Sequence, residues 1–283
     1  MIARAFEYTQ AASVAEALAA LQQDRDAKLL AGGHSLLPLM KLRLATAGRL
    51  VDIGRIADLR GVRREGDRIV VGALTTHAVL AQNPLLREML PVLSAAAQEI
   101  GDLQVRNRGT IGGSIAHGDA AADLPAAVLA LDATLHVATS AGEESLPAEG
   151  FFLGPMMTAL PEGGLLTAVS FPLPPQGTRQ AYRKVAHPAS GYAVVGVAAV
   201  LAMGEDGTVQ YARIALTGAG AAPFRAHGVE AALLDRTLSA ELAAEAAGRV
   251  GDGVEFAGDL YASPSYRRRL AEVHVRRTLM GLL

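Results

Sequence analysis

The chain has 283 residues, a formal net charge of −2 at pH 7 and no cysteine, and its length allows two domains of ordinary size. The near-neutral charge argues against nucleic acid as a partner, and the lack of cysteine excludes disulfides and an iron–sulfur cluster held by this chain. No stretch is apolar enough to span a membrane and residues 1–8 lack a signal-peptide core, so we expect a cytoplasmic protein with at most peripheral membrane contact.

Helical and strand-like patterns alternate through the first 171 residues. A capping box at Ser13 to Glu16 predicts the start of the first helix. The expected helices cover residues 14–21, 75–81, 85–97 and 124–131, and a loop is expected at 101–123. The expected strands cover residues 28–31, 48–53, 68–72, 134–138 and 165–171.

A proline-rich stretch at 172–177, P-L-P-P-Q-G, breaks both helix and strand and is the best candidate for a linker. Beyond it, strands precede helices, which is typical of an α+β domain. The strands are expected at 182–186, 192–203 and 209–216, and the helices at 230–234, 241–249 and 266–282. We therefore predict one domain over 1–175 and a smaller α+β domain over 176–283.

One glycine-rich stretch suggests a dinucleotide fingerprint. Gly218-Ala219-Gly220 follows a strand-like run, but Pro223 stands where the third glycine is needed. No β–α–β unit with an acidic residue follows, so we interpret the stretch as a turn after a strand.

Two other glycine turns carry the first functional signal. Gly32-Gly33-His34-Ser35 interrupts an apolar segment, and Thr110 to Ser114, T-I-G-G-S, repeats its small residues, hydroxyls and backbone N–H groups. Glycine pairs occur where the backbone takes positive φ or is closely approached. Two such loops facing each other across a groove can hold a diphosphate without any lysine. The alternative interpretation is that they are two unrelated turns with no binding role. The residues alone thus suggest a phosphate-bearing cofactor.

Other chemistry has little support in the sequence. None of the seven histidines lies four residues from another, and there is no G-x-S-x-G elbow and no cysteine nucleophile. We predict no metal site and no catalytic residue in this chain.

The two turns together closely resemble those of a known family, the flavin-binding medium subunits of molybdenum hydroxylases of the carbon monoxide dehydrogenase type. The chain is also similar to the central domain of xanthine dehydrogenase. The matching residues, which extend over nearly the whole chain, are A-G-G-H-S at 31–35, R-N-R-G-T-I-G-G-S at 106–114, F-E-Y at 6–8, G-A-L-T-T-H at 72–77 and R-I-A-L at 213–216.

The resemblance implies an FAD-binding domain of the vanillyl-alcohol oxidase-like (PCMH) type, with α+β subdomains at about 1–55 and 56–175. It implies noncovalent FAD that receives electrons from a small 2Fe–2S subunit and reduces an external acceptor. A large molybdopterin subunit oxidises the organic substrate, and the assembly is a dimer of heterotrimers. The lack of cysteine suits this division and counts against the benzoyl-CoA reductase branch.

The resemblance also implies which residues of the two loops bind FAD. His34 is expected to contribute its backbone and a polar edge but no covalent bond, and His117 is expected nearby. The residues of the first loop are Leu29, Leu30, Ala31, Gly32, Gly33, His34 and Ser35, and those of the second are Thr110, Ile111, Gly112, Gly113 and Ser114. Gly32 and Gly33 are expected to let the backbone close on the pyrophosphate.

Five further residues have an implied FAD role and a structural alternative. Asp123 would accept a hydrogen bond from a sugar hydroxyl, or cap a helix with proline at its first position. Ile100 and Leu166 would pack against the cofactor, or only in the core. Lys184 would reach the flavin edge, or be a solvated strand lysine. Tyr192 would cover one face of the isoalloxazine, or be a core tyrosine.

Two other classes of protein fit the sequence less well. A stand-alone flavin oxidase of the same fold would need a catalytic acid or base beside the ring, and the sequence offers none. A cofactor-free scaffold subunit would not explain the two glycine turns. The organic substrate is a property of the molybdenum subunit, and the acceptor stays open between NAD, quinone and oxygen.

Overall fold

The N-terminal part is built on a three-stranded sheet. In the computed structural model, which describes residues 2–283, β1 (Glu7–Gln10) and β2 (Ala27–Leu30) both pair in parallel with the central β3 (Arg49–Asp52). The helix α1 (Val14–Gln23) connects β1 to β2, and α2 (Leu36–Lys41) follows the first glycine loop. The Ser13 hydroxyl accepts the Glu16 N–H, which confirms the predicted start of α1.

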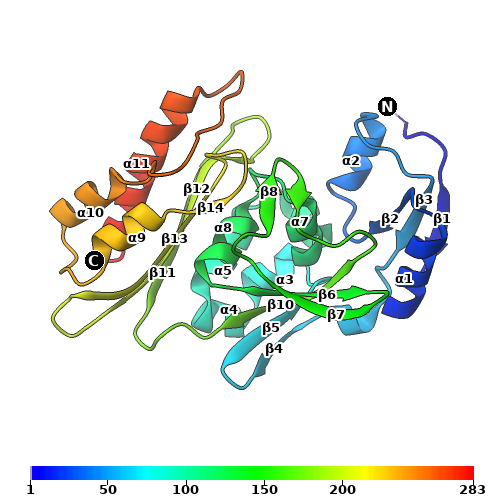
Figure 1. The fold of residues 1–283 in the computed structure, drawn as a ribbon, viewed down its shortest axis with the longest axis horizontal. Helices are drawn as coiled ribbons and strands as arrows, with labels where there is room; N and C mark the ends of the chain where they lie inside the picture. The colour runs from blue at the N-terminus through cyan, green and yellow to red at the C-terminus, as the bar shows by residue number, and fades with distance from the viewer. Residues whose placement is uncertain (1) are drawn as a thin grey trace.

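The middle of the chain holds a five-stranded antiparallel sheet with helices on one side (Figure 1). Its strand order is β4 (Val62–Glu65), β5 (Arg68–Gly72), β10 (Leu165–Pro172), β6 (Thr134–Thr139) and β7 (Gly142–Pro147). The helices are α3 (His77–Gln82), α4 (Pro84–Met89), α5 (Pro91–Gln98), α6 (Leu103–Arg108), α7 (Ile111–His117) and α8 (Asp123–Ala130). A 3-10 turn at Ala57–Leu59 and the hairpin of β8 (Phe152–Gly154) and β9 (Met157–Thr158) complete this part.

Two predictions for this part are wrong. The single helix expected at 85–97 is divided into α4 and α5, because Leu90 leaves the helical conformation before Pro91, which begins α5. The loop expected at 101–123 contains α6 and α7. Asp102 caps α6 and Thr110 caps α7, whereas the glycines of α7 lower its intrinsic helix propensity and so hide it in the sequence.

The C-terminal part has strands before helices, as predicted. The antiparallel order is β11 (Arg179–Ala186), β12 (Ala193–Met203), β13 (Val209–Thr217) and β14 (Phe224–Arg225). The helices α9 (His227–Leu233), α10 (Ala240–Ala247) and α11 (Pro264–Met280) cover one face of this sheet, and α5 and α8 cover the other (Figure 1). All ten residues from Ala193 to Ala202 are therefore buried.

The helix α8 lies between the two sheets and has no exposed side. All eight of its residues are buried. The hydrophobic cluster to which its leucines, valine and alanines belong also contains Ala198, Val200 and Ala215 of the C-terminal sheet. The alanines of α8 let the second sheet approach closely, which explains the density of alanine in this stretch. Within residues 2–283, no helix combines the length and the apolar character needed to cross a membrane.

The N-terminal sheet and the middle part meet where the two glycine loops touch. A Cβ on Gly32 would lie 2.3 Å from the Arg108 carbonyl oxygen and 2.8 Å from the Gly109 Cα. A Cβ on Gly112 would lie 2.5 Å from that of Ala73. Both glycines are thus required for the packing of backbone on backbone. The packing gives Gly32 a structural reason to be small, beside the expected approach of the cofactor.

Replacing Gly32 with alanine tests this contact. The two backbones must separate to admit the new Cβ, and overpacking of this kind costs about 1–3 kcal/mol. We expect the free energy of unfolding in urea to fall by that amount. Gly48→Ala is the matched control, because its Cβ has no neighbour closer than 3.5 Å. Equal losses in the two variants would contradict the contact.

Candidate cofactor-binding site

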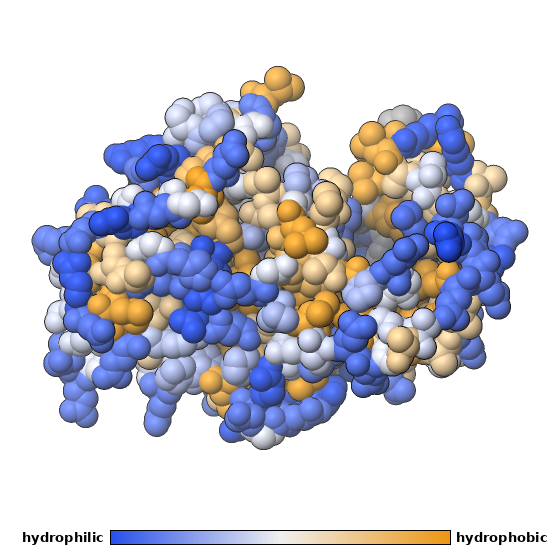
Figure 2. Space-filling model, viewed as in Figure 1, coloured by the Kyte–Doolittle hydropathy of each residue, from blue (hydrophilic) through white to orange (hydrophobic). Residues whose placement is uncertain are grey.

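A cavity of about 1090 Å³ lies where the N-terminal sheet, the middle part and the 190–192 segment meet. The surface is hollowed between the N-terminal part and the rest of the molecule (Figure 2). Small-molecule sites are typically about 300–1,000 Å³, so this cavity is large enough for an extended cofactor. Both glycine loops line it, as expected if they face each other across a groove.

All but two of the predicted site residues line this cavity. Ile111 is fully buried beneath the second loop, and Lys184 lies behind the wall with its side chain only 1% exposed. Those that line it are Leu29, Leu30, Ala31, Gly32, Gly33, His34, Ser35, Ile100, Thr110, Gly112, Gly113, Ser114, Asp123, Leu166 and Tyr192. His117 lines it as well.

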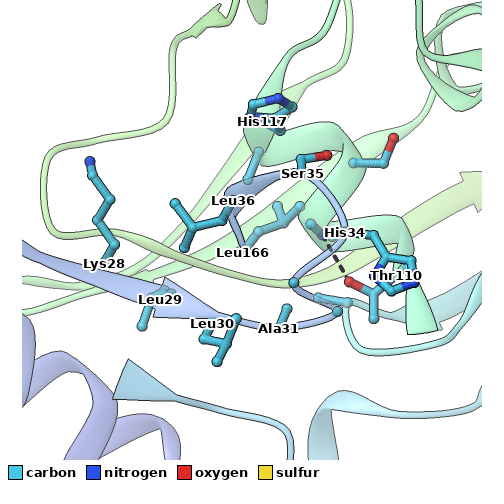
Figure 3. Close-up of a pocket in the computed structure, with 18 of the residues that line it drawn as sticks. Lys28, Leu29, Leu30, Ala31, His34, Ser35, Leu36, Thr110, His117 and Leu166 are labelled. Carbon is cyan, nitrogen blue, oxygen red and sulfur yellow. Dashed lines mark hydrogen bonds between the residues drawn. The ribbon is translucent and has the colours of Figure 1, made fainter. Parts of the chain in front are cut away.

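The first loop lines the cavity with residues whose amides are unpaired in the described part of the chain. Gly33 has φ +75°, a conformation that favours glycine, and it turns the chain from β2 into α2. Within residues 2–283, the N–H groups of residues 32–35 have no hydrogen-bond partner. The His34 ring lies near the second loop (Figure 3), with its Nε2 3.2 Å from the Gln104 carbonyl oxygen. Four consecutive amides are therefore available to an anionic group.

The second loop differs, because its amides from Ile111 to Ser114 already have partners. The Ile111 and Gly112 N–H groups donate to the carbonyls of Thr75 and Ala73 at 3.0 and 2.8 Å. Those of Gly113 and Ser114 donate to the Thr110 hydroxyl and carbonyl at 3.1 and 3.0 Å. The prediction of free amides in this loop is thus wrong, since it forms the first turn of α7. What remains for a ligand is the hydroxyl protons of Thr110 and Ser114.

Asp123 is the centre of a buried polar cluster behind the second loop. Its carboxylate accepts from the Tyr182 hydroxyl at 2.7 Å and pairs with Lys184 Nζ at 2.9 Å. Lys184 Nζ also donates to the Glu99 carbonyl at 2.6 Å. Burial raises the pKa of Asp123, and the nearby Lys184 charge opposes this shift. Burial, and then the Asp123 charge, raise the pKa of Tyr182 well above its usual range.

Both structural alternatives for these residues are wrong. Asp123 does not cap α8, because Ala122 occupies the N-cap position and Asp123 is the first helical residue. Pro125 is the third helical residue, not the first. Lys184 is not solvated, and it reaches the cavity only through Asp123. Sequence reasoning missed Tyr182, although Tyr182 and Lys184 are two residues apart on one strand and so share a face.

Tyr192 stands at the rim of the cavity and is 41% exposed, which rules out a core tyrosine. Its carbonyl accepts the His187 N–H at 2.7 Å, which closes a tight loop. Burial raises the pKa of its phenol, and the Asp119 charge adds to this shift. Leu166 is buried in the wall of the cavity. The turn at Ile100 is held by the Arg106 guanidinium, which donates to the Ile100 carbonyl at 2.8 Å.

His77 is a lining residue that sequence reasoning did not single out, although it ends the G-A-L-T-T-H match. Its ring packs against Gly109, and its buried Nδ1 has no hydrogen-bond partner within residues 2–283. Burial, and then the nearby His34, lower the pKa of His77 to about 4. The ring is therefore neutral at pH 7. Arg25 and Lys28, also missed, line the cavity as well and add positive charge to it.

Comparison with known proteins identifies the family. Residues 4–174 match the family model described as the FAD binding domain in molybdopterin dehydrogenase. Residues 180–282 match the CO dehydrogenase flavoprotein C-terminal domain. The chain therefore belongs to the FAD-binding flavoproteins of the molybdopterin dehydrogenases, and FAD is the cofactor that its fold and cavity accommodate.

Individual relatives match along their whole length. The carbon monoxide dehydrogenase medium chain of Hydrogenophaga pseudoflava is 42% identical over 280 residues, with 99% of this chain and 97% of the relative covered. The 6-hydroxypseudooxynicotine dehydrogenase complex subunit alpha of Paenarthrobacter nicotinovorans is 37% identical, with 98% and 94% covered.

Solved structures show the same fold. A chain of carbon monoxide dehydrogenase from Hydrogenophaga pseudoflava superposes with a TM-score of 0.96 at 43% identity, covering 100% of this chain and 98% of that one. A chain of quinoline 2-oxidoreductase from Pseudomonas putida 86 superposes with a TM-score of 0.94 at 33% identity, with the same coverage. The predicted fold class, an FAD-binding domain followed by a smaller α+β domain, is thereby confirmed.

The buried His77 gives the protein a defined sensitivity to acid. The unfolded chain binds a proton at His77 below about pH 6.5, whereas the folded chain does so only below about pH 4. Stability from this group is therefore complete above pH 6.5 and falls by about 1.4 kcal/mol per pH unit between the two values. We expect His77→Gln to flatten the pH dependence of the free energy of unfolding in that window. His117→Gln, on the same cavity, should leave it steep; a steep His77→Gln profile would contradict this.

Lys184→Met tests the buried pair. It leaves Asp123 without a counter-charge, and breaking a buried pair in this way typically costs about 3–5 kcal/mol. In the variant the folded-state pKa of Asp123 rises further above its unfolded value, so stability is lost as pH rises. We expect the deficit in unfolding free energy to be larger at pH 8 than at pH 5, and a double variant with Asp123→Asn to recover part of it. A deficit independent of pH would show that Asp123 keeps its charge without Lys184.

Proposed function

We propose that this chain is the flavoprotein subunit of a heterotrimeric molybdenum hydroxylase, in which it holds FAD noncovalently. Electrons arrive from a 2Fe–2S subunit and leave to an external acceptor. The observation that carries the proposal is the large cavity between two glycine loops, with four consecutive amides that have no partner within residues 2–283, in a chain of this family. When bound, FAD supplies the ability to accept electrons and pass them on singly or in pairs.

The lining residues divide the cofactor-binding task by their chemistry. The amides of residues 32–35 and the hydroxyls of Thr110 and Ser114 are suited to the diphosphate, since all are donors. Asp123, an acceptor once ionised, is suited to a sugar hydroxyl. Ile100, Leu166 and Tyr192 provide the apolar and aromatic surface that a flat ring system needs. Ile111 supports the second loop from below and Lys184 acts through Asp123.

His34 is proposed to hold the cofactor without a covalent bond. Its Nε2 already faces the Gln104 carbonyl, so the ring joins the first loop to α6.

The relatives support the proposed partners and leave the substrate open. They are described as a medium chain, a medium subunit or a complex subunit, so each works with other chains. Their substrates, according to their names, include carbon monoxide, glyceraldehyde, nicotine and caffeine, although this subunit is alike in all of them. We therefore assign the substrate to a large molybdopterin subunit, within a cytoplasmic dimer of heterotrimers.

Reduction of the purified assembly tests the relay. We expect a visible flavin spectrum, release of all flavin as FAD on acid precipitation, and bleaching by dithionite. An organic substrate should bleach the flavin only when the molybdenum and iron–sulfur chains are present, because the proposal assigns oxidation of the substrate to the molybdenum chain.

Three outcomes would contradict the proposal. Turnover of a small organic substrate by the isolated chain at about 1 per second or faster would favour the stand-alone oxidase. Colour that stays in the acid pellet, and is lost in His34→Ala, would indicate covalent attachment. No flavin band in the assembly, even after FAD is added, would favour a scaffold subunit.

A further inference from the structure

Three successive backbone carbonyls in the wall of the FAD cavity point into the C-terminal domain. They belong to residues 120–122, immediately before Asp123. The Gly218 N–H donates to the carbonyl of Ala120 at 2.6 Å, and the Ala193 N–H donates to that of Ala121 at 3.1 Å. The Thr217 hydroxyl lies 2.7 Å from the carbonyls of both Ala120 and Ala122. Asp119, Ala122 and Asp123 of the same segment line the cavity.

The glycine-rich stretch at the end of β13 makes this arrangement possible. Gly218 has φ +76°, and a Cβ there would lie 2.3 Å from the Ala193 carbonyl oxygen. Only glycine therefore lets β13 turn this close to the start of β12, and the turn brings the Thr217 hydroxyl and the Gly218 amide to adjacent carbonyls. The stretch that resembles a dinucleotide fingerprint thus holds a piece of protein backbone.

A buried arginine fixes the turn from behind. Arg267 on α11 is only 7% exposed, and its Nη1 donates to the Val194 carbonyl at 2.7 Å and to the Gly218 carbonyl at 2.5 Å. Its Nη2 donates to Asp259. Hydrogen bonds from a charged donor are stronger than neutral ones, so the guanidinium ties the start of β12 to the end of β13. Val194 lies two residues from Tyr192, at the rim of the cavity.

We propose that Thr217, Gly218 and Arg267 form a clamp through which the C-terminal domain sets the position of the Asp119–Asp123 wall of the FAD cavity. The inference rests on the proposed function only in naming FAD as the occupant. These three are positioning residues, because none of them lines the cavity. The Thr217 hydroxyl is the most informative of them, since its loss removes the side-chain donor to the Ala122 carbonyl and leaves the Ala120 carbonyl with only the Gly218 N–H. A buried carbonyl without a donor is costly.

Three variants of the full chain separate the clamp from general stability. Thr217→Val removes the hydroxyl and keeps the shape of the side chain, and Thr217→Ser keeps the hydroxyl. Thr278→Val is the matched control, because Thr278 is also fully buried and donates to a carbonyl, that of His274, within α11. The measurements are backbone amide hydrogen exchange over residues 119–123, the dissociation constant of FAD, the visible circular dichroism of the bound flavin and the global unfolding midpoint.

We expect Thr217→Val to speed exchange over residues 119–123 by about tenfold, which corresponds to about 1.4 kcal/mol, and to weaken FAD binding by a similar factor. Its flavin circular dichroism should change, and Thr217→Ser should restore the wild-type values. Thr278→Val should lower the midpoint without any of these effects.

Two results would overturn the clamp. One is that Thr217→Val and Thr278→Val change exchange over residues 119–123 equally, and the other is that neither changes it. A wild-type chain that binds no FAD in its assembly would instead contradict the proposed function, because the exchange measurement needs no cofactor.

Discussion

The close approach of two backbones, at Gly32 against Arg108 and Gly109, is the constraint on which the cavity depends. It joins the N-terminal sheet to the middle part at a distance that no side chain permits. The same contact brings residues 32–35, whose amides are unpaired within residues 2–283, and the hydroxyl-bearing Thr110 and Ser114 to one cavity. The size and shape of the cofactor site therefore depend on a glycine that packs against a neighbouring backbone.

The second determinant of the site is buried charge. Asp123 is kept in an apolar wall by Lys184 and Tyr182, which both come from β11 of the C-terminal domain. The unpaired His77 ring, by contrast, is kept neutral by its surroundings. One cavity wall thus carries a charge that a neighbouring domain stabilises, while another excludes charge. This contrast gives the cavity a fixed electrostatic pattern near neutral pH.

Much of the fold could be predicted from the sequence, and most of the predicted site residues line the cavity. Capping at Ser13 and strand alternation are local signals, and they predicted α1, α3, α8 and the strands β2, β3, β5, β6, β10, β12 and β13 close to their observed bounds. The divided helix at Leu90 and the helices at 103–117 were missed because proline and glycine break the local pattern in which helices are recognised. The partners of Asp123 were missed because ion pairs between distant segments leave no local trace.

The shared helix α8 has a consequence for what a domain means in this protein. Its eight residues are buried, with one side in the core of the flavin-binding part and another against β12 and β13. If either part unfolded alone, the other would expose a face made of alanine, valine and leucine to water. We therefore expect the two parts to unfold in a single transition. The irregular segment between β10 and β11 separates the two parts along the chain. We nevertheless expect them to behave as one cooperative unit in unfolding.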